Sequence, residues 1–208
     1  MSLQNRVLPT GDIVAMPARG TFLGNRGGRF HDPASQRLKQ RHWASKQWIC
    51  CLLSFKGRHR PVMGRGYTEL FFLDEVTALA AGHRPCFECR RTAADAFAQA
   101  WAHGHDLQEP PRAPEMDKVL HEQRLIGQAK RTLPAKLADL PDGAMFQSGE
   151  DLFAWRDGAA LPWSPQGYGP AEKPSPATRI SLLTPPAITA ALRAGYRPEW
   201  HGTASLRI

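Results

Sequence analysis

The chain has 208 residues and a formal net charge of +8, with 42% apolar and 22% charged residues. This composition is typical of a folded globular protein and excludes a wholly disordered chain. No apolar run approaches the roughly 18 residues of a transmembrane helix, and residues 1–6 lack the apolar segment of an export signal. We therefore expect a cytoplasmic protein without a membrane partner.

The positive charge is concentrated in the first third of the chain. Residues 1–68 contain twelve Lys and Arg residues and only two acidic ones, whereas residues 69–208 carry slightly more acid than base. Such a local basic field attracts polyanions, of which nucleic acid is the commonest. A solvated basic surface that only keeps the protein soluble is the alternative. The candidate phosphate-binding residues are Arg26, Arg29, Lys56, Arg58, Arg60, Arg65, Arg90 and Arg91.

Three segments make up the first part of the chain in sequence order. Residues 8–32 are rich in Gly, Pro and Asp with little periodicity, which predicts an irregular loop. The short apolar run at 47–55 predicts a buried strand, and residues 67–73 predict a second strand.

The next segment contains two predicted helices. Asp74 is a good N-cap for a short helix over residues 75–81, and Gly82 suits the left-handed position that ends such a helix. After the sequence His-Arg-Pro-Cys-Phe-Glu-Cys, the apolar spacing predicts a helix over 92–103 with one face in the core.

The last third of the chain has a different pattern. A helix is predicted over 115–131, after a Pro-rich connector. From residue 140 onward, turn signals recur every seven or eight residues between short apolar segments, which predicts a small β-meander. The remaining expected elements are the meander strands at 144–147, 152–155 and 159–163, a strand at 179–183, and a last helix from Thr184 to about Gly195.

The four cysteines give the strongest chemical signal. Without an export signal, disulfides are not expected among Cys50, Cys51, Cys86 and Cys89. Cys86 and Cys89 form a Cys-x-x-Cys knuckle before a helix, a spacing that allows two thiolates to bind one metal ion. A redox pair and unreactive thiols are the alternatives, but a redox pair needs a strand directly before the helix.

A structural zinc site needs four ligands, so two more are expected. Adjacent strand residues point to opposite faces, so only one of Cys50 and Cys51 can join the knuckle. We favour Cys51, because it shares one face of the predicted strand with Ile49, Leu53 and Phe55. This apolar face should meet the core and the knuckle behind it. Among the histidines, we favour His31 over His59 and His83 as fourth ligand, because it lies in a loop that can fold back. A water in this position would instead leave an open zinc site suited to catalysis.

Residues 71–90 combine an aromatic strand end, an Ala-rich short helix that ends in Ala-Gly, and the motif Arg-Pro-Cys-x-x-Cys-Arg. In this combination, and over about residues 47–101, the chain resembles the N-terminal metal-binding domain of the Ada DNA-repair protein family. The resemblance implies that Cys86 and Cys89 bind zinc and that the domain binds DNA. It also implies that Cys50 or Cys51 stands where the family accepts a methyl group from a DNA phosphotriester. The family's upstream Cys-x-x-x-Cys pair has no counterpart here, so the ligand set is incomplete.

Together these features predict an α+β protein. Its expected parts are a basic N-terminal extension (1–46), an Ada-like zinc domain (47–103), a connector with a helix (104–138), and a β-rich unit with a terminal helix (139–208). The expected function is nucleic-acid binding, with DNA favoured, beside a zinc site. One alternative is an enzyme on nucleic acid, in which Cys51 accepts an alkyl group or zinc and His31 activate water for phosphodiester cleavage. The other is a non-catalytic structural or interaction module.

Overall fold

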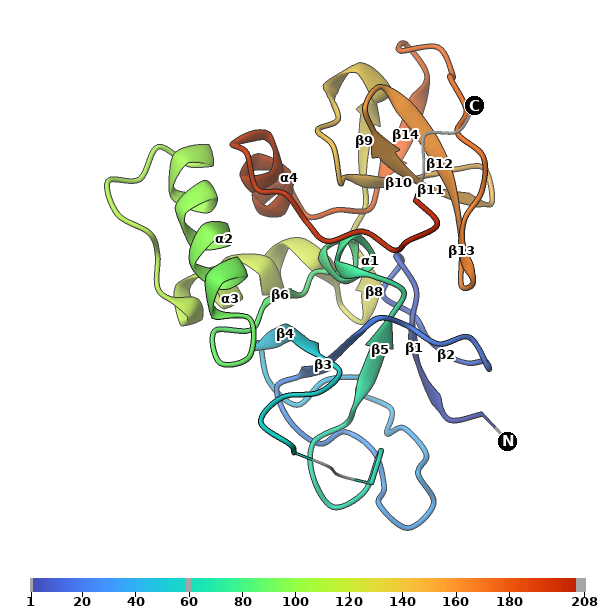
Figure 1. Cartoon of the computed structure of the whole chain (residues 1–208), viewed down its shortest axis with the longest axis vertical. Coiled ribbons are helices and arrows are strands. Elements are labelled where there is room, and N and C mark those ends of the chain that lie inside the picture. Colours follow the sequence, from blue (N-terminus) through green and yellow to red (C-terminus); the bar gives the residue numbers. More distant parts are fainter. Residues whose placement is uncertain (1, 59–60, 205–208) are drawn as a thin grey trace.

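The computed structural model describes residues 2–58 and 61–204. In this part of the chain, two six-stranded sheets and four α-helices form the α+β fold that the sequence predicted. Figure 1 shows the N-terminal sheet at the bottom, the C-terminal sheet at the top, and α2, α3 and α4 to one side of them. No helix of the described residues is both long and apolar enough to cross a bilayer.

The N-terminal sheet is mixed, in the strand order β2-β1-β5-β3-β4-β6. β3 lies between β4 and β5 and is antiparallel to both, whereas β6 runs parallel to β4. The strands are β1 (Gln4–Val7), β2 (Ile13–Ala15), β3 (Phe22–Arg26), β4 (Trp48–Leu52), β5 (Leu70–Phe72) and β6 (Arg84–Pro85).

The C-terminal sheet is antiparallel throughout, in the order β13-β12-β11-β10-β14-β9. It contains the predicted meander, because the turn signals after residue 140 separate β10, β11 and β12. The strands are β9 (Leu133–Lys136), β10 (Met145–Ser148), β11 (Asp151–Arg156), β12 (Ala159–Ser164), β13 (Gly167–Tyr168) and β14 (Arg179–Leu182), with a 3-10 turn at Leu137–Asp139.

The helices carry the main apolar core. α2 packs against α4, and both contribute to a cluster with the C-terminal sheet that includes Phe97, Trp101 and Ile188. The predicted helices over 75–81 and 92–103 are confirmed. The four helices are α1 (Glu75–Ala80), α2 (Arg91–Gly104), α3 (Ala113–Arg124) and α4 (Pro186–Arg193).

Two predictions about secondary structure were wrong. Residues 8–32 contain β2 and β3 instead of an irregular loop. β3 was missed because Gly24 weakens its strand pattern, although the fold requires glycine there: a Cβ at Gly24 would lie 2.2 Å from the Ile49 carbonyl oxygen. The helix predicted to residue 131 ends at Arg124, because Gly127 adopts a φ of +63° and turns the chain into the hairpin of β7 (Leu125–Ile126) and β8 (Ala129–Lys130).

Buried polar residues tie α1 to the C-terminal half. Asp74 caps α1 as predicted, accepting a hydrogen bond from the Thr77 backbone N–H at 2.8 Å. The same carboxylate accepts bonds from the Tyr168 hydroxyl at 2.8 Å and from the His201 N–H at 3.0 Å. These bonds fix the start of α1, and through it the short segment that leads to the Cys-x-x-Cys knuckle.

Candidate metal centre

The alternation of side chains along β4 separates its two cysteines. Trp48 and Cys50 point into the core and are 1% and 0% exposed. Ile49 and Cys51 point to the opposite face, where Cys51 lies across from Leu23 of β3. The expectation that the Cys51 face meets the core was therefore wrong, because that face borders a cleft at the surface.

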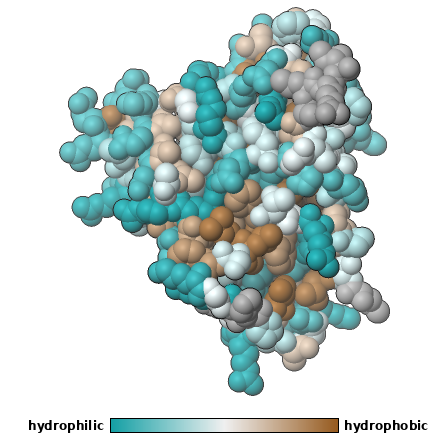
Figure 2. All heavy atoms as spheres, viewed as in Figure 1, coloured by the Kyte–Doolittle hydropathy of each residue, from teal (hydrophilic) through white to brown (hydrophobic). Residues whose placement is uncertain are grey.

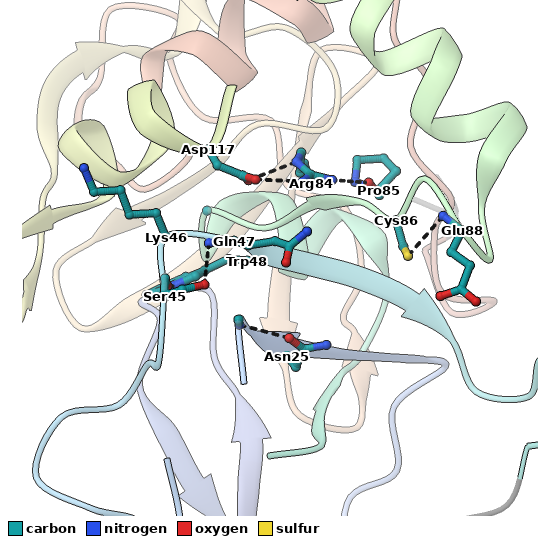
Figure 3. Close-up of polar contacts among 12 residues, drawn as sticks. Asn25, Ser45, Lys46, Gln47, Trp48, Arg84, Pro85, Cys86, Glu88 and Asp117 are labelled. Atoms are coloured by element: carbon teal, nitrogen blue, oxygen red, sulfur yellow. Dashed lines mark hydrogen bonds and ion pairs between the residues drawn. The ribbon is translucent and has the colours of Figure 1, made fainter. Parts of the chain in front are cut away.

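Cys51 meets the knuckle through the short strand β6. β6 pairs with β4, and the Cys86 N–H then donates to the Cys50 carbonyl at 3.0 Å, so the knuckle begins beside the end of β4. The sulfur atoms of Cys51, Cys86 and Cys89 all lie within 4.8 Å of one another. Figure 3 shows Cys86 and Glu88 of the knuckle, where the Glu88 N–H donates to the Cys86 sulfur at 3.4 Å.

This geometry fits a thiophilic metal ion. Metal–sulfur bonds of about 2.3 Å in a tetrahedral site place the sulfurs roughly 3.8 Å apart. Small side-chain rotations therefore bring all three sulfurs onto one ion. Thiolates favour soft or borderline cations over Mg²⁺ or Ca²⁺. The structure thus confirms a three-cysteine group that can hold a metal.

The thiols also interact with each other. Hydrogen bonds from Cys51 and Cys89 lower the pKa of Cys86 to about 2. The bond that Cys51 donates to Cys86 raises the pKa of Cys51 far above its ordinary value. The three thiols are therefore hydrogen-bonded to one another, and Cys86 accepts bonds from the other two. Metal binding replaces those donors with a cation and releases protons.

Cys50 does not belong to the cluster. Its sulfur lies 3.7 Å from the Arg90 Nη1 atom, on the core side of β4. Burial raises the pKa of the Cys50 thiol well above its ordinary value. Cys50 therefore remains a neutral core side chain.

The predicted histidine ligands lie in other surroundings. His31 is fully buried, and its ring nitrogens lie 2.7 Å from the Thr68 hydroxyl and 2.8 Å from the Gly64 carbonyl oxygen. His31 is not among the residues whose ligand atoms meet at the cysteines. His83 packs between the rings of Trp48 and Phe72, and burial lowers its pKa well below the ordinary value. His59 lies outside the described residues.

A cleft of about 390 Å³ opens beside the three cysteines. Its floor is the outward face of β5, β3 and β4, and the loop that follows β4 lines its other side. Figure 2 shows hydrophobic side chains gathered over these strands. Polar and aromatic residues that line the cleft include Asn25, Phe55, Arg58, Glu69, Phe71 and Glu88.

Two polar residues of the cleft were missed by the sequence analysis. Asn25 is 9% exposed, and its side-chain oxygen accepts a hydrogen bond from the Gly27 N–H at 2.9 Å. Glu69 is 4% exposed and accepts a bond from the Met63 N–H at 2.7 Å, which holds the lining loop against the sheet. The alternation along residues 22–26 would have placed Asn25 on the Cys51 side, had this segment been recognised as a strand.

The predicted phosphate-binding residues of the described chain fall into three groups. Arg26 and Arg90 are buried, and Arg90 forms ion pairs with Glu75 and Glu199, both at 2.7 Å. Arg58 and Arg91 are exposed but paired with Glu88 and Asp95. The others in the described part of the chain are exposed: Arg29, Lys56 and Arg65. Arg60 lies outside the described residues.

No protein-family model, curated protein or solved structure matches this chain. The interpretation of the site therefore depends on its own geometry.

Proposed function

We propose that this protein binds zinc through Cys51, Cys86 and Cys89 and binds nucleic acid, with DNA favoured, at the cleft beside them. The observation that carries the proposal is the meeting of three sulfurs at the edge of a 390 Å³ cleft. Zinc is the commonest ion held by cysteines in this spacing. The resemblance of residues 71–90 to the metal-binding domain of the Ada family supports both zinc and DNA.

The surroundings of the cleft suit a polynucleotide. Arg58 lines it, and Lys56 is exposed on the same loop. Arg29 donates to the Arg65 backbone carbonyl at 3.0 Å, so the Arg29 guanidinium lies beside the backbone of a second exposed cation, Arg65. Phe55 and Phe71 line the cleft and offer aromatic surfaces on which an unpaired base can stack.

The first test is the metal content of the purified protein. We expect about one zinc per chain, lost in Cys51→Ser and Cys86→Ser and retained in Cys50→Ala. Protein without zinc, or equal loss in Cys50→Ala, would contradict the site.

The second test is the salt dependence of binding to a DNA oligonucleotide. Each phosphate contact contributes about 0.9 to the slope of log K against log salt concentration. The triple substitution Arg29→Gln, Lys56→Gln and Arg65→Gln should lower the slope by about 2 to 3. The matched control replaces three exposed cations of the C-terminal half with Gln: Lys136, Lys173 and Arg179. A flat salt response in the unsubstituted protein would rule out nucleic-acid binding and favour a structural module.

Alkyl transfer to Cys51 is the second candidate function, since Cys51 is both a cluster member and part of the cleft wall. In such a step the Cys51 sulfur attacks the methyl carbon of a phosphotriester. The C–O bond breaks, the S–C bond forms, and the phosphodiester leaves as an anion. The test is peptide mass spectrometry after incubation with DNA carrying methyl phosphotriesters. A methyl group on Cys51 supports the reaction, and an unmodified Cys51 excludes it.

Phosphodiester cleavage with His31 has less support. The ring nitrogens of His31 are both within hydrogen-bond distance of protein groups, Thr68 and Gly64. A nuclease assay with and without a chelator tests this alternative, and we expect no cleavage in either condition.

A further inference from the structure

A second pocket lies on the opposite face of the strands that carry the metal centre. Along β3 and β4, Asn25 and Ile49 face the cleft, whereas Arg26 and Trp48 pair with each other across the strands and line a separate cavity of about 230 Å³. The two cavities share no lining residue. The second one is enclosed by the β1–β2 turn, the segment before β4, the end of α3 and the β7–β8 hairpin.

Three cations line this pocket: Arg26, Arg124 and Lys130. Arg26 and Arg124 are 3% and 0% exposed, and both guanidinium groups lie over the Trp48 ring, at 3.9 and 3.8 Å from its centroid. Positive charge at such a density within a protein is unfavourable unless an anion lies nearby.

The protein itself supplies only neutral acceptors to these cations. Arg26 donates to the Gly11 carbonyl at 2.7 Å, Arg124 donates to the carbonyls of Gly82 at 2.9 Å and Lys46 at 2.7 Å, and Lys130 donates to the Ala80 carbonyl. Among the described residues, no carboxylate forms an ion pair with any of the three. Asp12 lines the pocket but is exposed to solvent.

Burial outweighs the nearby carboxylates in the ionisation of these groups, since Asp12 opposes the pKa shifts of Arg26 and Lys130 and Asp117 opposes that of Arg124. Burial lowers the pKa of Arg26 to about 9 and that of Arg124 to about 8, and repulsion from Arg26 contributes to the shift at Arg124. Burial, followed by repulsion from Arg26 and Arg124, lowers the pKa of Lys130 to about 7. A bound anion would oppose all three shifts.

Two donors of the pocket residues have no partner. The Trp43 Nε1 and Arg124 Nε atoms are buried and make no hydrogen bond in the described structure. Trp43 is 9% exposed, and both residues line the pocket. Unpaired buried donors are rare in folded proteins, because leaving them unbonded is costly. The protein's own groups therefore leave two donors of the pocket residues unsatisfied.

We propose that this pocket binds a small oxyanion of the phosphate class. A phosphate group accepts many hydrogen bonds and carries two negative charges, which matches guanidinium and ammonium donors around one point. The pocket volume is below the range of sites for drug-sized ligands, so it admits the phosphate group alone. The phosphate is either a free ion or the terminal phosphate of a nucleotide whose remainder lies outside. This site is independent of the proposed metal centre.

The test is calorimetric titration of the full chain with inorganic phosphate, beside thermal unfolding in phosphate and in sodium chloride of equal ionic strength. We expect saturable binding and a rise in Tm that chloride does not reproduce. A 5′-phosphorylated dinucleotide and its unphosphorylated form distinguish the two sources. Binding of the phosphorylated form identifies a terminal phosphate, and binding of inorganic phosphate alone identifies the free ion. Absence of saturable binding by either would overturn the proposal.

Two variants assign the binding to this pocket. Lys130→Gln should weaken phosphate binding about tenfold, since a charge-assisted bond is lost. Lys136→Gln, an exposed lysine on β9, is the matched control and should bind as the unsubstituted protein does. Trp43→Phe keeps an aromatic ring, although a smaller one, and removes the Nε1 donor, so it should weaken binding even if Lys130→Gln does not fold. Unchanged affinity in Trp43→Phe and in a folded Lys130→Gln would show that phosphate binds elsewhere.

Discussion

The two faces of the strand pair β3–β4 differ in whether their charged side chains are exposed or buried. On the Cys51 face, the thiols meet beside a cleft lined by both apolar and polar side chains, and the positive charge there lies on exposed side chains such as Arg58. On the Trp48 face, a pocket encloses Arg26, Arg124 and Lys130 beside aromatic rings, and none of these three forms an ion pair with a carboxylate of the described residues. Neighbouring residues of a strand point to opposite faces, so a shift of one position along the strand moves a side chain to the other side of the sheet.

The charges of the two faces therefore have different consequences. Exposed cations attract a polyanion at long range and are screened by salt. Buried cations destabilise the fold unless an ion satisfies them, so they select a small, fully desolvated ligand. The basic N-terminal third of the sequence contains both exposed and buried cations, and its composition does not distinguish between them.

The largest expected effect comes from removing a cysteine of the metal centre. Cys86→Ser should lose the metal, and because metal binding is coupled to folding, the knuckle and the start of α2 should lose order. Hydrogen exchange of the amides in residues 84–95 measures this. Cys50→Ala is the matched control on the opposite face and should leave the exchange of these amides close to that of the unsubstituted protein. Equal protection in Cys86→Ser and the unsubstituted protein would show that the cluster binds no metal.

Gly24→Ala should disturb both faces at once. The new Cβ would lie 2.2 Å from the Ile49 carbonyl oxygen and 2.7 Å from the Phe72 ring, so β3 must move away from β4. We expect a loss of about 3 kcal/mol in the free energy of unfolding, measured by urea denaturation. Gly202→Ala, where no atom lies within 4 Å of the added Cβ, is the control and should change stability by less than about 0.5 kcal/mol. If Gly24→Ala is as stable as the control, the tight pairing of β3 with β4 is incorrect.

The pH dependence of the free energy of unfolding should reveal the shifted pKa of Lys130 in the pocket on the Trp48 face. Lys130 holds its proton up to about pH 10.5 in the unfolded chain but only to about pH 7 in the folded protein. Between these values the unfolded state binds more protons, so the contribution of Lys130 to the free energy of unfolding rises with pH. Arg26 from β3, Arg124 from α3 and the nearby His42 are shifted in the same direction by burial, and Asp12 opposes the shift at Arg26.

The measurement is urea denaturation from pH 6.5 to 9.5 in buffers without phosphate. Lys130→Met should reduce the slope of stability against pH by the equivalent of about one proton. Lys136→Met, an exposed lysine of the C-terminal sheet, should leave the slope unchanged. A Lys130→Met slope equal to that of the unsubstituted protein would mean that Lys130 keeps an ordinary pKa in the fold.

The smallest expected effect lies at the rim of the cleft on the Cys51 face. Arg58 and Glu88 form an exposed ion pair at 2.7 Å. Glu88→Gln should change the free energy of unfolding by less than about 0.5 kcal/mol, because exposed ion pairs contribute little. It should strengthen DNA binding slightly, since it frees Arg58 and removes a negative charge from the cleft. Asp95→Gln frees Arg91 in the same way away from the cleft, so an equal gain in both variants would argue against the cleft as the binding surface.

The sequence determined the parts of this protein that depend on neighbours along the chain. Asp74 caps α1, Gly82 ends it, and the turn signals after residue 140 delimit the meander, because capping and turn formation need only a few adjacent residues. The spacing of Cys86 and Cys89 likewise predicted two of the three cysteines that meet in the cluster.

The sequence favoured Cys51 over Cys50 as the third cysteine, which the cluster bears out, but tertiary structure supplied the actual reason. Cys51 instead of Cys50 meets the knuckle because β6 pairs with β4, and Arg26 is buried because β3 lies between two strands. His31 bonds to Thr68 and Gly64, residues more than thirty positions away. Such contacts depend on strand pairing between distant segments. Local composition does not encode that pairing, and in β3 the glycine needed for close packing weakened the strand pattern.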